Sequence, residues 1–342
     1  MAVTIKDIAS VAGVSHTTVS RALRGHTRIS TETIERIQKI ADELGYVPNT
    51  VARGLKTRRS RVLGVIVRRI DDPFFSEVLQ GIEDVLQEAD YSLFLAASRR
   101  NPDREREIMQ AMGERQVEGV IVSSTQIQPE QLRQLGHFDV PMILINNQAI
   151  DEPDIHSVYH DDAFGSQQLI QHLIDLGHQR IAFLGNVHGG KTNADRLRGY
   201  REALLQAGLS INPDYIVVGK NGQPDGGSEG IRDVLELSPR PTAVICYNDL
   251  MAIGAIQGVL QAGLRVPEDI SITGFDNIEL AGYVSPSLTT FHQPKYELGR
   301  EAAQMMLRVL VNGETAVSSP QKVIMLRGEL IQRHSTAAHH DE

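Results

Sequence analysis

The sequence lacks the features of several protein classes. Its 342 residues include a single cysteine, Cys246, so no internal disulfide can form. Cys246 lies within an apolar run, which favours a buried small side chain over a nucleophile. The longest apolar run, near residues 62–67, has only the length of a strand, so we expect no segment to span a bilayer. Because the N-terminus also lacks the apolar core of a secretory signal peptide, we expect a cytoplasmic protein with no membrane partner.

The twelve histidines give no sign of a metal site or of an enzyme. No spacing among them is typical of metal ligands, and no nucleophile stands out beside a base. His339 and His340 lie in an acidic C-terminal segment, residues 337–342, which we expect to be disordered. We therefore predict no metal, no cofactor and no enzymatic activity.

Positive charge is scarce overall but concentrated at one end. The chain carries a net charge of −9 at pH 7, with 34 lysines and arginines against 43 acids. Residues 1–60 hold ten basic residues and five acids, a net charge of +5, which leaves −14 for the remainder. A basic segment releases counterions from a phosphate backbone, and an acidic body stays away from it. The split indicates a nucleic-acid-binding head.

Residues 4–23 have the pattern of a helix-turn-helix. Thr4 and Asp7 have capping-box spacing, Gly13 is placed at a turn, and Ser15 can cap a second helix. Two apolar sets recur at helical spacing: Ile5, Ile8, Ala9 and Ala12, then Val14, Val19, Ala22 and Leu23. Such a unit places the N-terminal residues of its second helix in the DNA major groove.

The residues in that position are His16, Thr17 and Arg21, which are polar and lie off the apolar face. The local charge favours DNA as the partner of this surface. A small helical bundle without a ligand is the alternative interpretation of the same pattern.

A third helix and a basic linker follow. Ser30 can cap a helix whose apolar stripe ends at Gly45. Residues 50–59 are basic and contain a glycine, so this stretch is marginal as an isolated helix. Its one prominent apolar side chain, Leu55, stands beside Lys56, as expected of a minor-groove wedge with a phosphate contact. A plain flexible linker explains the same residues equally well.

From residue 61 onward, strands and helices alternate. Eight stretches, mostly continuous valine and isoleucine runs, are typical of buried parallel strands: 62–68, 91–97, 119–123, 142–146, 180–184, 215–219, 243–247 and 271–275. Amphipathic stretches between them predict helices at 74–89, 103–115, 162–176, 193–207, 226–237 and 250–262. This order predicts a doubly wound α/β architecture.

So many parallel strands are better accommodated by two sheets than by one, with a break near Tyr159. We expect a strand–helix unit at 288–310 and a closing strand at 322–332 to cross back between the two lobes. The predicted domains are a helix-turn-helix head (1–48), a hinge (49–60), a two-lobed body (61–336) and a disordered tail (337–342). The N-lobe is expected to hold 61–159 and 292–320, and the C-lobe 160–291 and 321–336. Strand ends and helix N-termini that face each other across two lobes make a ligand site.

Seven further motifs stand in order along the chain: YVPN at 46–49, ARxL at 52–55, DPFF at 72–75, DRLRGY at 195–200, YND at 247–249, GFDN at 274–277 and SLTTFHQ at 287–293. Together with the head pattern they resemble the LacI/GalR family of transcription regulators over nearly the whole chain. The resemblance implies a small all-α helix-turn-helix head on a two-lobed α/β body with two doubly wound parallel sheets, similar to periplasmic sugar-binding proteins. It also implies a homodimer that binds a pseudo-palindromic operator.

Carried over by position, the resemblance gives candidate site residues. Arg21 would pair bidentately with guanine, and Leu55 would be the minor-groove wedge. The DNA-binding set is Ser15, His16, Thr17, Arg21, Asn49, Leu55 and Lys56. The effector-binding set is Asp72, Phe74, Asn146, His160, Arg196, Asn248, Asp276 and Gln293. Their chemistry suits a sugar, because charged and amide groups bind hydroxyls and an aromatic ring covers an apolar ring face.

Simpler roles are open for two of these residues, and the placement of a third depends on a loop. Asp276 could cap a helix N-terminus, and Arg196 could form a surface ion pair. The position of His160 in the motif order depends on a variable loop.

One motif argues for a different function. Residues 185–192 satisfy the P-loop pattern G-x-x-x-x-G-K-[ST] between a predicted strand and a predicted helix. Asp249, after another strand, has the position of a Walker B acid. A nucleotide-binding or nucleotide-hydrolysing protein is therefore an alternative. The next helix, however, carries the motif with Arg196 that the resemblance assigns to the effector, and Gly-rich loops are common in α/β sheets.

A sugar-binding protein without a DNA role and a sugar-metabolising enzyme are further alternatives. The first would have no use for a basic head, and the second has no recognisable catalytic pair. We therefore predict a sequence-specific DNA-binding transcription regulator of the repressor type. Its operator affinity would be controlled allosterically by a small sugar-like effector bound between two lobes.

Overall fold

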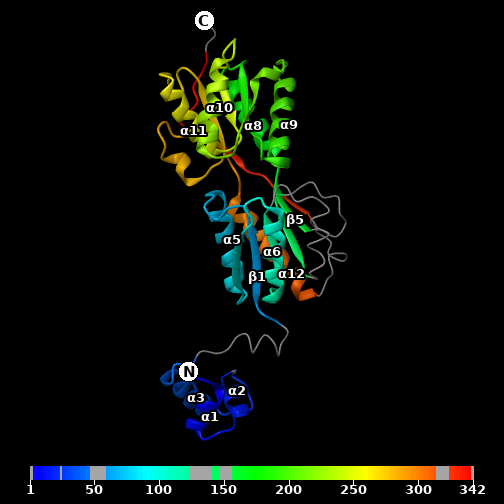
Figure 1. Ribbon diagram of the computed structural model, residues 1–342, viewed down its shortest axis with the longest axis vertical. Coiled ribbons are helices and arrows are strands. Elements are labelled where there is room, and N and C mark those ends of the chain that lie inside the picture. Colours follow the sequence, from blue (N-terminus) through cyan, green and yellow to red (C-terminus); the bar gives the residue numbers. More distant parts are fainter. Residues whose placement is uncertain are drawn as a thin grey trace. The chain divides into compact units, whose positions relative to one another are not determined.

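The structure, a computed structural model, describes residues 3–23, 25–46, 59–123, 140–146, 156–312 and 323–339 (Figure 1). The chain divides into two compact units, Met1–Ser60 and Arg61–Glu342, which we call the head and the body. The boundary between them lies at the end of the predicted hinge, residues 49–60, most of which lies outside the described residues.

Three short helices form the head: α1 (Ile5–Ala12), α2 (His16–Ala22) and α3 (Thr31–Glu43). The Asp7 carboxylate accepts hydrogen bonds from the backbone N–H and the hydroxyl of Thr4, at 2.8 and 2.7 Å. Ser15 Oγ accepts from the backbone N–H of Thr18 at 3.1 Å. Gly13 ends α1 with φ of 66°, a left-handed conformation that strains residues with a side chain. The predicted caps and turn are confirmed.

The apolar faces of these helices meet in one small core. Its buried members are Ile8, Ala9, Ala12, Val19, Ala22, Ile37 and Ala41. Ile5, Val14 and Leu23 pack against its edge, so both predicted apolar sets contribute to the core. The polar face of α2 is left at the surface.

Two six-stranded sheets form the body, one in each lobe. The strands are β1 (Val62–Val67), β2 (Ser92–Ala97), β3 (Gly119–Ser123), β4 (Met142–Ile145), β5 (His156–His160), β6 (Ile181–Asn186), β7 (Ile216–Gly219), β8 (Ala243–Cys246), β9 (Ser271–Asp276), β10 (Thr289–His292), β11 (Val323–Leu326) and β12 (Glu329–Ile331). The N-lobe sheet has the order β11-β5-β4-β3-β1-β2, and the C-lobe sheet has the order β12-β10-β9-β8-β6-β7. Among the described residues, β12 pairs antiparallel with β10 and the other pairings are parallel.

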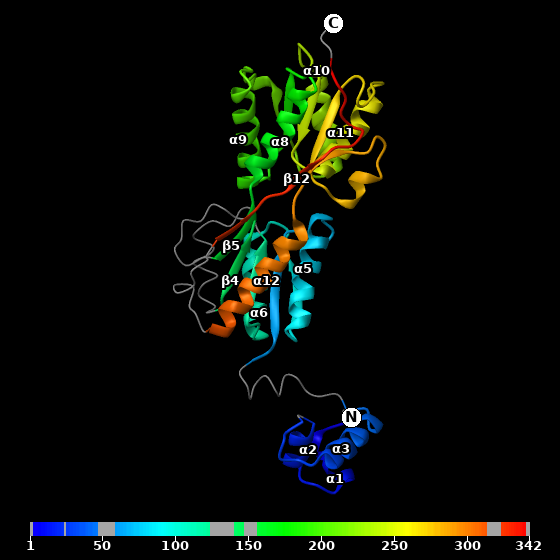
Figure 2. The ribbon, with the colours of Figure 1, turned by 180° about the vertical axis from the view of Figure 1, so that it is seen from behind.

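Helices cover both faces of each sheet (Figures 1 and 2). They are α5 (Phe74–Glu88), α6 (Pro102–Glu114), α8 (Asp162–Asp175), α9 (Gly190–Gln206), α10 (Pro224–Glu236), α11 (Asp249–Gln261) and α12 (Lys295–Asn312), with 3-10 turns η1 (Pro213–Tyr215) and η2 (Glu279–Gly282). In the N-lobe, α5 and α12 pack on one face and α6 on the other. In the C-lobe, α10 and α11 share one face, while α8 and α9 share the other. The predicted doubly wound, two-lobed architecture is confirmed.

The C-terminal crossing between the lobes differs from the prediction. We expected a single closing strand at 322–332, within a C-lobe segment 321–336. Instead β11 pairs with β5 in the N-lobe sheet, and only β12 joins the C-lobe sheet. The chain changes lobes at Gly328, where a Cβ would overlap the carbonyl oxygen of His292. The last segment of the C-lobe therefore begins after Gly328 and not at residue 321, as the sequence pattern indicated.

β5 is a strand that the sequence analysis missed. Its sequence, His-Ser-Val-Tyr-His, has polar residues at both ends and no long apolar run. Its pairing with β4 and β11 nevertheless buries four of its five residues. Strand partners supplied from distant parts of the chain therefore override a weak local pattern.

The last described residues are bonded to the C-lobe, whereas we expected disorder from residue 337. The backbone N–H of Ala337 donates to Ser271 Oγ, and its carbonyl contacts His178 Nε2, both at 3.1 Å. The backbone N–H of His339 donates to the Leu176 carbonyl at 2.7 Å, and its ring stacks on His178 with centroids 5.4 Å apart. The acidic composition did not reveal these contacts, because each partner lies far away in the sequence.

His178 makes the stability of the fold depend on pH. Burial lowers its pKa to about 4; the hydrogen bond to Ala337 opposes this shift, and His339 and His172 add to it. The unfolded chain binds that proton at a pKa of about 6.5. As pH falls from about 6.5 to about 4, the unfolded state gains a proton that the folded state does not bind, so the free energy of unfolding decreases.

We therefore expect His178→Gln to lessen the loss of stability between pH 7 and pH 5. Urea unfolding of the wild type and the variant at both values measures this difference. Equal changes in the free energy of unfolding for the two proteins would contradict the buried, neutral state of His178.

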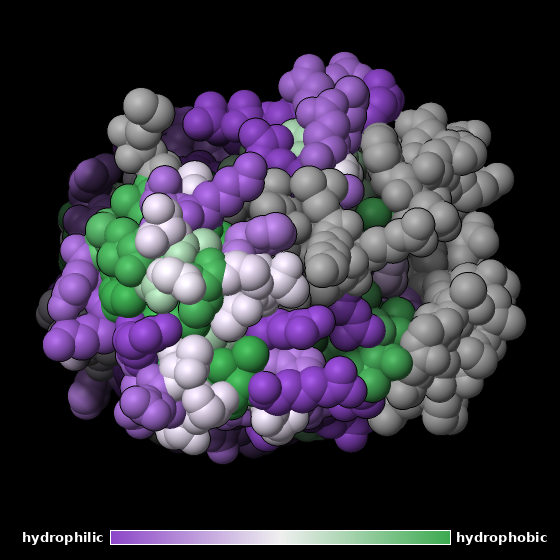
Figure 3. Space-filling view, turned by 90° about the horizontal axis from the view of Figure 1, so that it is seen from below, coloured by the Kyte–Doolittle hydropathy of each residue, from purple (hydrophilic) through white to green (hydrophobic). Residues whose placement is uncertain are grey.

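The described surface is mixed in character. Hydrophilic residues predominate on the face shown in Figure 3, and hydrophobic residues gather in separate groups between them. No helix of the described residues has the length and apolar character needed to cross a membrane. Two neighbouring apolar side chains of the C-lobe, Leu280 and Tyr283, are 51% and 78% exposed.

Candidate ligand cleft and nucleic-acid interface

The polar ends of the strands meet in a cleft between the two lobes. Its walls are Arg68, Asp72, Phe74, Phe75, Ser123, Asn146, Thr192, Arg196, Tyr247, Asn248, Asp276 and Gln293. Seven of the eight predicted effector-binding residues are in this set. The eighth, His160, lies behind the wall, where its ring meets the ring of Phe74 edge-on at 6.0 Å. Burial, with Arg196 and Lys295 adding to it, holds the pKa of His160 well below its usual value.

Two residues of the cleft hold backbone conformations that side chains disfavour. Asn146, just after β4, has φ of 57°, and Asp276, at the end of β9, has φ of 118°. Asn277 follows with φ of 52°. Conformations of this kind cost about 1–3 kcal/mol each and persist where the surroundings enforce them, commonly at binding sites. The sheets therefore fix the direction of an amide from the N-lobe and a carboxylate from the C-lobe.

Arg196 is the central cation of the cleft and is 4% exposed. Its Nε donates to Asp162 Oδ1 at 2.9 Å, Nη2 lies 3.5 Å from Asp276 Oδ1, and Nη1 donates to the Tyr247 carbonyl. The guanidinium carbon lies 3.7 Å from the ring centroid of Phe275. The alternative of a surface ion pair is therefore wrong. A guanidinium held on two carboxylates and a ring is rigid, which suits a site that must discriminate ligands.

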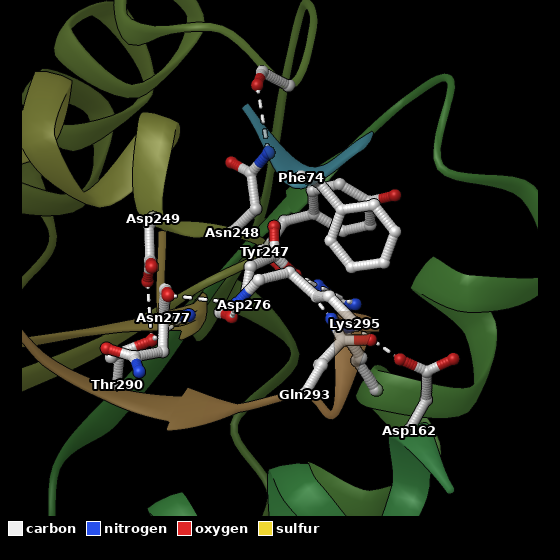
Figure 4. Close-up of polar contacts among 12 residues, drawn as sticks. Phe74, Asp162, Tyr247, Asn248, Asp249, Asp276, Asn277, Thr290, Gln293 and Lys295 are labelled. Carbon is white, nitrogen blue, oxygen red and sulfur yellow. Dashed lines mark hydrogen bonds and ion pairs between the residues drawn. The ribbon is translucent and has the colours of Figure 1, made fainter. Parts of the chain in front are cut away.

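Asp276 is held by two side chains from the segment that follows β10 (Figure 4). Gln293 donates to its Oδ1, and Lys295 Nζ donates to its backbone carbonyl at 2.7 Å. Burial raises the pKa of the Asp276 carboxyl, while Arg196 opposes that shift. The nearby turn η2 is capped by Ile278 instead, so the alternative role of Asp276 as a helix cap is wrong.

Asn248 and Asp249 brace the cleft. Asn248 Oδ1 caps α11 by accepting from the Met251 N–H at 2.9 Å, and its Nδ2 donates to the Gly222 carbonyl at 3.1 Å. The buried Asp249 carboxylate accepts from the Ile278 N–H at 2.8 Å and from Thr290 at 2.5 Å (Figure 4). Asp249 thus fastens the loop that carries Asp276 and faces no free space, so it does not act as a Walker B acid.

On the N-lobe side, Asp72 and Arg68 form a pair next to Phe74. Arg68 Nη2 lies 3.3 Å from Asp72 Oδ2, and Asp72 Oδ1 accepts from the Phe74 N–H at 3.2 Å. Arg68 was not predicted from the sequence. A signal for it existed, because Arg68 follows the buried run of β1, and ligands of parallel sheets bind at the carboxyl ends of strands. Tyr247 was missed as well, and it stands at a comparable position directly after β8.

Three polar atoms of the cleft are buried without a hydrogen-bond partner among the described residues. They are a donor, Arg68 Nη1, and two acceptors, Asn146 Oδ1 and Gln293 Oε1. Buried polar atoms without partners are costly, and a ligand that satisfies them is bound correspondingly tightly. The missing partner must both accept and donate hydrogen bonds. The rings of Phe74 and Tyr247 line the same space and offer an apolar contact.

The P-loop alternative fails on the geometry of residues 185–192. Lys191 Nζ pairs with Asp195 at 2.6 Å and is therefore engaged within α9. The N–H groups of His188 and Gly189 donate to the side chain and carbonyl of Asn186, at 3.0 and 2.9 Å. A P-loop needs a free lysine and free backbone donors for phosphate. The loop uses two of its own donors and its lysine is paired, so the geometry does not support a P-loop.

The head presents the predicted recognition surface. Ser15, His16, Thr17 and Arg21 are all exposed at α2, opposite its buried residues Val19 and Ala22. The remaining predicted DNA-binding residues, Asn49, Leu55 and Lys56, lie outside the described residues.

A helix-turn-helix head joined to a two-lobed body with a polar cleft defines a class of protein: ligand-responsive DNA-binding regulators. The comparisons with known proteins agree. Residues 4–49 match the family model for bacterial regulatory proteins of the lacI family, and residues 170–336 match the periplasmic binding protein-like domain. The chain belongs to the lacI family of bacterial transcription regulators. It is a DNA-binding transcription regulator and not an enzyme.

Individual relatives match over most of their length. The HTH-type transcriptional repressor PurR of Aliivibrio salmonicida is 35% identical over 89% of this chain and 91% of its own. The ribose operon repressor of Haemophilus influenzae is 36% identical over 90% of this chain and 92% of its own. Among solved structures, the lac repressor dimer bound to operator and the anti-inducer ONPF is 25% identical, covers 99% of this chain and 100% of its own, and has a TM-score of 0.88.

Proposed function

We propose that the chain is a cytoplasmic, homodimeric repressor whose operator binding is controlled by a sugar or sugar derivative in the cleft. The name of the ribose operon repressor supports a sugar, and the lac repressor dimer on its operator supports the assembly. In this proposal His16, Thr17 and Arg21 meet base edges in the major groove, flanked by Ser15 and Asn49, and the hinge inserts Leu55 with Lys56 beside it.

The observation that carries the choice of a sugar is the set of unpaired atoms in the cleft. A sugar hydroxyl donates and accepts, so one class of group can satisfy Arg68 Nη1, Asn146 Oδ1 and Gln293 Oε1 together. Asp276 and Arg196 add a charged acceptor and donor, and Phe74 can cover the apolar face of a pyranose or furanose ring.

Binding must also move the lobes or their side chains. The free volume of the cleft is about 40 Å³, far below the 300–1,000 Å³ of typical small-molecule sites. The lobes are joined by three short crossings, β5 to α8, β10 to α12 and β11 to β12. We infer that the effector selects one opening of the lobes and so changes the spacing of the two hinges in the dimer. A coupling free energy of about 1–3 kcal/mol changes operator affinity about 5- to 150-fold.

A thermal unfolding screen tests the sugar assignment. Monosaccharides and disaccharides are added to the full-length protein, with Mg-ATP as a negative control because Lys191 is paired. We expect at least one sugar to raise Tm in a concentration-dependent way. At a concentration of 100 times Kd, the free energy of unfolding should increase by about 2.7 kcal/mol. A panel in which Mg-ATP or a non-hydroxylated compound stabilises the protein and no sugar does would contradict the assignment.

A further inference from the structure

A second cavity lies beside the cleft, and arginines dominate its walls. It is lined by Arg68, Arg69, Ile70, Asp71, Ala97, Arg99, Arg100, Asn221, Gly222 and Gln223, and we call it the arginine cavity. Its free volume is about 650 Å³, against about 40 Å³ in the cleft. Arg68 lines both spaces, so the two spaces adjoin at this side chain.

Only part of the positive charge in the arginine cavity is balanced by the chain. Arg69 binds Asp71, the one acid of its walls, through two hydrogen bonds of 2.8 and 2.6 Å. Arg68 is paired with Asp72. The side chains of Arg99 and Arg100 form no hydrogen bond or ion pair with any residue in the described ranges. Two guanidinium groups are therefore available at this wall.

The backbone holds both of these arginines in a disfavoured conformation. Arg99 has φ of 54° and Arg100 has φ of 60°, so two successive residues with long side chains lie in the left-handed region. The segment is fixed on both sides, because Arg99 N–H donates to the Arg68 carbonyl at 3.0 Å and Asn101 caps α6. Conformations of this kind mark positions where side-chain direction matters.

Arg99 and Arg100 are both exposed at this wall, and Arg100 lies close enough to Arg68 for their charges to repel. Burial, followed by repulsion from Arg68, lowers the pKa of Arg100. Residues 61–342 together carry −14, so a positive cavity is an exception within the body and attracts anions toward it. The N-terminus of α6 does not supply the attraction, because Asn101 already accepts from the N–H groups of Asp103 and Arg104.

The far wall links the arginine cavity to the ligand cleft. Asn221 and Gln223 come from the loop before α10, and the carbonyl of Gly222 between them accepts the hydrogen bond from Asn248. Asn248 is a cleft residue. An occupant of the arginine cavity therefore lies between an N-lobe wall of arginines and a C-lobe loop that is bonded to the effector site.

We propose that the arginine cavity is a subsite for an anionic substituent of the effector, held by Arg99 and Arg100. The ligand class is then a hydroxylated small molecule with a phosphate or a carboxylate, such as a sugar phosphate or a sugar acid. Guanidinium groups bind both anions through paired hydrogen bonds. This proposal rests on the proposed function of the cleft and names the ligand class more narrowly.

The test uses the full-length protein and matched probes. Glucose is compared with glucose 6-phosphate and glucuronate, ribose is compared with ribose 5-phosphate, and inorganic phosphate is tested alone, all at one ionic strength. We expect an anionic probe to raise Tm more than its neutral partner does. In the double variant R99Q/R100Q, we expect affinity for that probe to fall at least tenfold, while affinity for the neutral partner changes less than twofold. The phosphate and carboxylate arms distinguish the two anions.

A matched control removes the same charge elsewhere. R201Q/R240Q alters two exposed arginines of the body that line neither space, and it should leave anion affinity unchanged. The proposal is overturned if no anion, inorganic phosphate included, stabilises the wild type more than R99Q/R100Q, or if the control variant shows the same loss. If Asp276→Asn abolishes binding of neutral sugars while R99Q/R100Q has no effect, the anionic subsite fails and the proposed function stands.

Discussion

Replacing Asp276 by asparagine is expected to abolish the response to effector while leaving operator affinity unchanged. The variant keeps the size of the side chain but loses the charge that faces Arg196 at 3.5 Å. Removing one partner of a buried, hydrogen-bonded charge pair at a binding site costs about 2–5 kcal/mol, or roughly 30-fold to several thousand-fold in affinity. Titration calorimetry with the effector and operator binding by fluorescence anisotropy measure the two quantities separately.

The fold should survive this change, because Arg196 keeps its bond to Asp162 and Asp249 still fastens the neighbouring loop. Asp233→Asn, at an exposed position of α10, is the matched control and should behave as the wild type does. An Asp276→Asn protein that responds normally to effector would show that the cleft is not the effector site. Loss of operator binding in the absence of effector would show that Asp276 is needed for the structure instead.

Truncation of Leu55 is expected to weaken specific operator binding at least tenfold, about 1.4 kcal/mol, in the variant Leu55→Ala. A wedge contributes only where base steps open, so it adds to specific binding and not to phosphate contacts. The basic residues of the head remain, so binding to scrambled duplex and its salt dependence should stay nearly unchanged. Anisotropy titrations of both duplexes over a range of salt concentrations measure this.

Val51→Ala provides the comparison, because it shortens another apolar side chain in the same stretch. It should leave the ratio of specific to non-specific affinity close to that of the wild type. If Leu55→Ala weakens binding to operator and to scrambled duplex by the same factor, residues 50–59 act as a plain linker with a general role in binding.

The parts of the fold that follow from local chemistry were predictable from the sequence. Ser15 and Gly13 each have a short-range function as cap or turn, and the runs that form β1 and β8 are apolar because both faces are covered. β5 was not predicted, because its pairing with β4 and β11 stabilises it, and the single predicted closing strand is two strands, β11 and β12, in different sheets. The lobe to which a strand belongs depends on its partner and on crossings such as the one at Gly328.

The candidate site also has residues that could be predicted from the sequence and residues that could not. Position in ordered motifs was enough to predict six of the cleft residues, including Asp276 and Arg196. The role of Asp249 in fastening a loop, and the burial of Arg196, depend on contacts between segments far apart in the chain. Arg99 and Arg100 carry no motif, and only their backbone conformation and the cavity beside them draw attention to them.

The central claim is that the head and the cleft are two coupled sites of one molecule. The most direct measurement is a complete linkage cycle on the wild type, with operator affinity measured with and without a ligand whose thermal stabilisation requires Asp276. We predict that this ligand changes operator affinity at least fivefold, and that operator changes the affinity for the ligand by the same factor. A ligand that saturates the cleft without changing operator affinity would contradict it.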